Sequence, residues 1–87
     1  MSFSSNRKAV FDESLPLAHR ASHARSCALH VANKLGVPRS AVFVEVARRT
    51  RVDLDHPASV AEVLRAFALL EELRQGQALL ASSHEGG

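Results

Sequence analysis

A glycine and a proline two residues apart, Gly36 and Pro38, separate two segments whose apolar residues recur at helical spacing. Glycine readily adopts the left-handed conformation that ends a helix, whereas proline disrupts a helix interior but is tolerated where the next one begins. Ser40 follows as a candidate cap. The break therefore predicts a corner between two helices, over residues 15–35 and 39–51.

The first of these helices follows Ser14, a candidate cap, and carries Pro16 in its first turn, where proline is tolerated. Its apolar residues recur at spacings of four and three, which places them on one stripe of an α-helix. They are Leu17, Ala21, Ala24, Ala28, Val31 and Leu35. Because half of the stripe is alanine, we expect another helix to approach it closely.

The segment 41–50 is open to two interpretations. Val42, Val44 and Val46 alternate with other residues, as in a β-strand. A single strand would have no partner within the monomer, although two copies of the chain could pair such strands in a dimer. As a helix, the segment places Val42, Phe43 and Val46 on one apolar side, and we favour this interpretation.

A capping-box pattern, Ser59 followed by Glu62, predicts a third helix over residues 58–75. Its core face would contain Val60, Val63, Leu64, Phe67 and Leu70. A second apolar strip lies beside it and consists of Ala66, Leu69 and Leu73. This strip indicates either a homodimer surface or a central helix buried on most sides.

These patterns predict an all-α chain with three main helices and one domain over residues 15–81. Residues 1–14 contain few apolar positions and are expected to form a loose arm, or else a short helical turn that docks Val10 and Phe11. Residues 82–87 are expected to form a flexible tail. At 87 residues the chain buries only about two-thirds of its unfolded surface, so a partner surface would add stability.

The composition favours a cytoplasmic protein. The single cysteine excludes an internal disulfide, and no apolar run approaches the ~18 residues that would span a bilayer. The formal charge of +2 is mildly basic and is compatible with nucleic acid as a partner. Phosphate-binding loops and nucleophile motifs are missing from the sequence, so we expect no enzyme activity and no cofactor.

The corner resembles the helix-turn-helix of bacterial transcriptional regulators. The resemblance rests on about sixteen residues and is carried by Ala32, Leu35, Gly36, Val37, Arg39, Ser40, Val42 and Val46. It implies that the second helix lies in the major groove, with Arg39 and Ser40 near the base edges. Phe43, Val44 and Ala47 would then face the groove, where such regulators usually carry hydrogen-bonding side chains.

Two functions follow as hypotheses. The first is a homodimeric regulator that contacts DNA through Arg39, Ser40, Arg48, Arg49 and Arg51. The second is a helical adaptor that binds a protein through Phe43, Val44, Ala66, Leu69 and Leu73.

A metal-responsive role is a third interpretation. Neighbours at spacings of three and four share a helix face and could ligate zinc, copper(I) or nickel. The candidates are His19, His23, Cys27 and His30, and one helix alone cannot complete the coordination, so His56 or a second copy would have to contribute. Exposed histidines beside a buried cysteine explain the same pattern, and we expect no bound metal.

Overall fold

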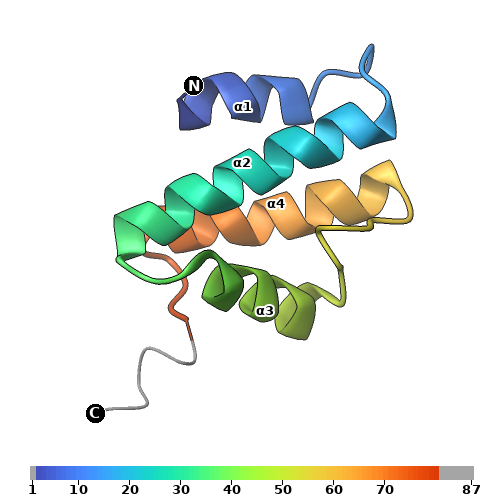
Figure 1. The fold of residues 1–87 in the computed structure, drawn as a ribbon. Helices are drawn as coiled ribbons and strands as arrows, with labels where there is room; N and C mark the ends of the chain where they lie inside the picture. The colour runs from blue at the N-terminus through green and yellow to red at the C-terminus, as the bar shows by residue number, and fades with distance from the viewer. Residues whose placement is uncertain (1, 81–87) are drawn as a thin grey trace.

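A computed structural model describes residues 2–80, in which the chain forms four helices and no strand (Figure 1). The helices are α1 (Phe3–Val10), α2 (Leu17–Leu35), α3 (Arg39–Thr50) and α4 (Val60–Gln75). Helix α2 is central and contacts the other three, while α1 and α3 lie toward opposite sides of the molecule. The all-α prediction is confirmed for these residues, with four helices in place of the three expected.

The additional helix is α1, so the expectation of a loose arm over residues 1–14 is wrong for the residues that α1 contains. Ser2 caps it by accepting the N–H of Ser5 at 3.1 Å. Phe3, Asn6 and Val10 are buried along one side of the helix. A helix of eight residues is unstable alone, and α1 is held by this packing against the rest of the chain.

Helix α2 ends where the glycine predicts. Gly36 has a φ of 70°, and the N–H of Val37 donates to the carbonyl of Ala32 at 3.0 Å, which satisfies the end of the helix. The predicted stripe is buried at Ala21, Ala24, Ala28 and Val31, whereas Leu17 at one end is half-buried and Leu35 at the other is exposed. The start differs from the prediction, because Pro16 occupies the capping position and Ser14 instead donates to Asp12 Oδ1 at 2.6 Å.

The segment 41–50 lies within α3, which decides between helix and strand in favour of helix. Val42 and Val46 are buried, whereas Val44 is 65% exposed, as a helical rather than an alternating arrangement requires. Pro38 occupies the capping position and Ser40 lies within the first turn, so the predicted cap at Ser40 does not form. Arg51 ends the helix with a φ of 61°.

Helix α4 begins with the predicted capping pattern, in which Ser59 Oγ accepts the N–H of Glu62 at 3.2 Å. The second apolar strip is buried within the chain, whereas Val60 and Leu64 of the predicted core face are half-buried. The buried residues of the helix are Val63, Ala66, Phe67, Leu69, Leu70 and Leu73. Gly76, with a φ of 79°, ends the helix, and residues 77–80 continue from it with Leu80 buried. The tail expected over residues 82–87 lies outside the described residues.

Candidate nucleic-acid interface

Helix α3 lies at the edge of the helical assembly, with one side packed against α2 and α4 and the other side free (Figure 1). Residues three or four positions apart along an α-helix lie on the same face of that helix. On the free side these exposed residues are Ser40, Val44, Ala47, Arg48 and Arg51. From the N-terminal to the C-terminal end of α3, this side therefore carries first a hydroxyl, then an apolar centre and finally a basic end.

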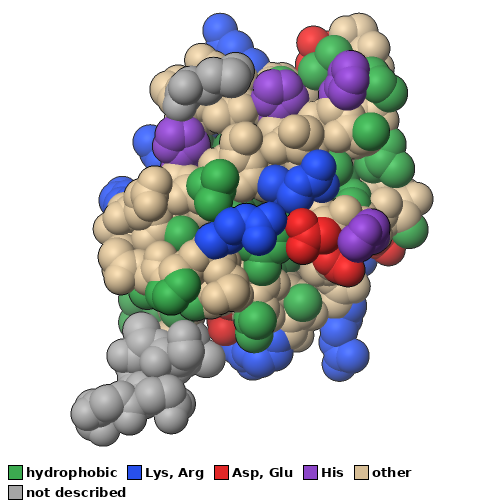
Figure 2. Space-filling view, in the orientation of Figure 1, with side chains coloured by type: hydrophobic (Ala, Val, Ile, Leu, Met, Phe, Trp, Pro, Cys, Tyr) green, Lys and Arg blue, Asp and Glu red, His purple; other side chains and the backbone are tan. Residues whose placement is uncertain are grey.

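Four arginines surround the C-terminal end of α3: Arg48, Arg49, Arg51 and Arg65. We call this group the arginine cluster. Arg65 belongs to α4 and reaches α3 through its Nε, which donates to the carbonyl of Thr50 at 3.1 Å. Cations are favourable at this end of a helix because its carbonyl groups carry partial negative charge. Figure 2 shows Lys and Arg side chains projecting at the lower edge of the molecule, where α3 lies in Figure 1.

One buried carboxylate, Glu45, lies beside this cluster. Its Oε2 is 2.6 Å from Nη2 of Arg48 and 3.5 Å from Nη1 of Arg49. The hydrogen bond and the charge of Glu45 raise the pKa of Arg48, which therefore keeps its charge. Two guanidinium groups share one carboxylate, so the cluster as a whole retains a net positive charge.

The N-terminal end of α3 differs from this basic end. Nη2 of Arg39 lies 3.3 Å from Oδ1 of Asp55, and its guanidinium carbon lies 3.9 Å from the centre of the Phe43 ring. Arg39 is therefore paired with a carboxylate and stacked on an aromatic face. Arg39 and Arg48 are nine residues apart, or about 14 Å along the axis. The structure thus groups Arg48, Arg49 and Arg51 but separates Arg39 and Ser40 from them.

Arg65 is the basic residue that sequence reasoning missed. It lies on a different helix from the other three members, and its separation in sequence gave no reason to place it beside α3. Only the turn that carries the chain from Arg51 to α4 brings it there. Within that turn Val52 and Leu54 are buried, which anchors the connection to the core.

The predicted protein-binding residues do not form one surface. Val44 is exposed and Phe43 is half-buried, both on α3. Ala66, Leu69 and Leu73 have exposed fractions of 0%, 6% and 1%. Their strip is filled within the chain, which corresponds to the buried-helix interpretation, so it offers no surface for a second copy.

Two of the four candidate metal ligands on α2 make other contacts, whereas His19 is exposed and His30 is half-buried. Nδ1 of His23 lies 2.8 Å from Oδ1 of Asn6, a contact that joins α2 to α1. Cys27 is fully buried beside the carbonyl of Phe3, and burial raises the pKa of its thiol to about 12. Within residues 2–80, no group of three or more His, Cys, Asp or Glu side chains is placed to hold a metal ion.

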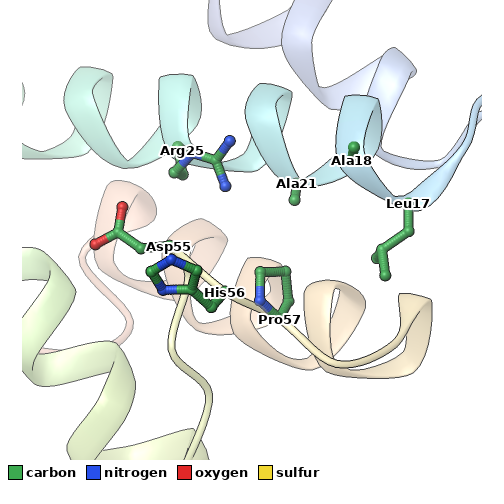
Figure 3. Close-up of a pocket in the computed structure, with 7 residues that line it drawn as sticks. All are labelled: Leu17, Ala18, Ala21, Arg25, Asp55, His56 and Pro57. Carbon is green, nitrogen blue, oxygen red and sulfur yellow. The ribbon is translucent and has the colours of Figure 1, made fainter.

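A surface hollow of about 250 Å³ lies between the first half of α2 and the turn that precedes α4 (Figure 3). Arg25 borders it and donates from Nη1 to the carbonyl of Leu54 at 2.9 Å. Asp55 and His56 face it from the turn, and Asp55 is paired with Arg39. Arg25 and Asp55 hold the turn against α2 and α3, and the hollow brings no nucleophile and base together within the described chain.

Among the described residues, no helix has the length and apolar character needed to cross a membrane. Comparison of the chain with protein-family models, with curated proteins and with solved structures finds no match.

Proposed function

We propose that the protein is a cytoplasmic regulator that binds duplex DNA, with the arginine cluster against the phosphate backbone. The observation that supports this function is the gathering of Arg48, Arg49, Arg51 and Arg65 at the free edge of the molecule beside a single buried carboxylate. Guanidinium groups suit phosphate recognition because their planar fork can donate two parallel hydrogen bonds. The homodimer predicted from the sequence stays a prediction.

The free side of α3 supports backbone contact more than base readout. Val44 and Ala47 occupy its centre and offer no hydrogen bonds to base edges, while Arg39 is paired with Asp55. The basic end, by contrast, can neutralise phosphates of any sequence. We therefore expect weak sequence preference and strong dependence on salt.

The test measures the affinity for a fluorescent 25-base-pair duplex by anisotropy, at 50 and 200 mM salt. Four phosphate contacts predict a loss of affinity of about 150-fold across this range, because the logarithmic slope is about −0.9 per contact. Removing Arg48 and Arg51 together (Arg48→Ala with Arg51→Ala) should reduce that loss to about 12-fold. Arg49 still pairs with Glu45 in this variant, so the buried carboxylate keeps a cationic partner.

Lys8→Ala provides the matched control, because Lys8 is an exposed cation on α1, away from α3. Lys8→Ala should change the slope of log affinity against log salt concentration by less than half of the value for one phosphate contact. Circular dichroism should report equal helix content in all variants. An unchanged slope in the double variant, or an equal change in Lys8→Ala, would show that the arginine cluster is not the contact surface.

The second candidate function is a helical interaction module that binds protein through α3. The specific observation is Val44, a β-branched apolar side chain that is 65% exposed at the centre of the free side. Apolar centres with arginines nearby are common in protein interfaces. A second copy of the chain is the partner that can be tested directly.

If α3 pairs two copies, Val44→Asp should convert a dimer to a monomer, because each copy would bury a carboxylate in an apolar contact. Sedimentation velocity over a hundredfold range of concentration measures this change. Leu29→Asp, at an exposed leucine of α2, is the control and should leave the sedimentation coefficient unchanged. A wild-type chain that is monomeric throughout, or a dimer that survives Val44→Asp, contradicts self-association through α3.

A further inference from the structure

An apolar groove of about 160 Å³ lies where the C-terminal ends of α2 and α4 meet the segment that follows α4. Figure 1 shows these two helix ends at the same end of the molecule. The groove is lined mainly by Leu35, Val37, Leu73, Ala78, Leu79 and Leu80. Leu73 and Leu80 are buried, whereas Leu35 and Leu79 are 38% and 63% exposed. Two large apolar side chains are thus left in contact with water around a hollow.

The size of the groove limits what it can hold. Cofactor and drug sites usually occupy roughly 300–1,000 Å³, so this groove is too small for such ligands. It has room for one leucine-sized or phenylalanine-sized side chain from a binding partner. Covering the exposed parts of Leu35 and Leu79 would remove apolar surface from water, which favours association.

Two cations lie beside the groove and indicate the charge of the partner. Nζ of Lys34 donates to the carbonyl of Arg74 at 2.6 Å, and Nη1 of Arg49 donates to the carbonyl of Leu79 at 3.3 Å. A carbonyl accepts a hydrogen bond without cancelling the charge of its donor. The surroundings are therefore cationic, although Arg49 also shares the carboxylate of Glu45.

We propose that this groove docks an acidic amphipathic helix of another protein, which inserts one bulky apolar side chain and places carboxylates near Lys34 and Arg49. Amphipathic helices commonly bind grooves in this way. A second copy that presents the same groove would bring cations against cations, which is unfavourable. The seven residues after Leu80 contain one apolar side chain, that of Ala81, which is too small to fill the groove.

The test is a titration of the ¹⁵N-labelled full-length chain with a synthetic 16-residue peptide, followed by NMR. The peptide carries leucines at positions i, i+4 and i+7 and glutamates on its other face. We expect shifts at residues 35–37 and 73–80 and a Kd that rises at least fivefold in Leu79→Ala. Leu29→Ala removes a leucine that is 43% exposed outside the groove and should leave the Kd unchanged.

Charge is tested with a second peptide in which lysines replace the glutamates. This peptide should bind the wild-type chain at least tenfold more weakly than the acidic peptide does. Lys34→Glu should reduce this difference in affinity between the two peptides. The proposal would be overturned if both peptides bound equally well, or if Leu29→Ala weakened binding as much as Leu79→Ala does. It would also be overturned by chemical-shift changes spread over the whole chain. A concentration-dependent dimer that Leu79→Ala dissociates would also overturn it, because a second copy would then be the occupant.

Discussion

Phe67→Ala is expected to lower the free energy of unfolding by about 3–5 kcal/mol, the range for removing a fully buried phenylalanine. Phe67 has an exposed fraction of 0% and makes two aromatic contacts with the N-terminal part of the chain. Its ring centre lies 5.7 Å from that of Phe3, in a stacked arrangement, and 5.5 Å from that of Phe11, edge to face. The substitution thus removes both core volume and the aromatic contacts to the region of α1.

Urea unfolding followed by circular dichroism measures this change. A domain of this size has a total stability of roughly 4–13 kcal/mol, so the alanine variant can be largely unfolded. Phe67→Leu, which keeps most of the volume, should unfold measurably with a loss of about 1–2 kcal/mol. Phe11→Ala is the control, because Phe11 is 45% exposed and should lose less than half as much as Phe67→Ala. Equal losses at Phe67 and Phe11 would contradict the central position assigned to Phe67.

The second large effect concerns Cys27, whose thiol should react with a disulfide reagent at pH 8 about 1,000-fold more slowly than an unfolded thiol. The thiolate is the reactive form, and burial raises the pKa of Cys27 from 9.0 to about 12. Only about one native molecule in 10,000 would carry the thiolate at pH 8, against roughly one in ten unfolded molecules. Absorbance of the released thiol, with and without 8 M urea, measures both rates.

The same shift makes stability depend on alkaline pH. Well below pH 9 the thiol is protonated in both states, and its contribution to stability is fully present. Between pH 9 and about 12 the unfolded state loses this proton first, so stability falls as pH rises, by up to about 1.4 kcal/mol per pH unit. In Cys27→Ala the part of the alkaline loss of stability that comes from the thiol should disappear. An identical alkaline slope in both proteins, or equal labelling with and without urea, contradicts the buried thiol.

The helices that were predicted correctly are those with strong local signals. The left-handed turn at Gly36 and the capping of α4 by Ser59 depend on residues close in sequence, so they are readable without the fold. Helix α1 was expected only as the alternative to a loose arm, because its stability comes from burial of Phe3 and Val10 against distant residues. Its own sequence contains no apolar stripe long enough to predict a packed helix.

The candidate site was predicted only in part, because some of its residues are close in sequence and others are brought together by packing. Arg48, Arg49 and Arg51 are adjacent in sequence and fall at one end of a helix that the sequence already predicted. The addition of Arg65 and the burial of Glu45 are tertiary, since both depend on how α3 packs against other parts of the chain. The second apolar strip of α4 was recognised, but whether it faced a partner or the core depended on the number of packed helices.

By itself, the sequence determined an all-α chain, the end of α2 at Gly36 and the basic end of α3. Spacing, capping residues and glycine conformation act over one or two helical turns, and they are sufficient for such features. Only the tertiary structure decided that α1 joins the core, that the strip of Ala66, Leu69 and Leu73 is buried, and that Leu35 and Leu79 remain exposed around a groove. Burial depends on which distant surfaces meet, and no local pattern specifies that.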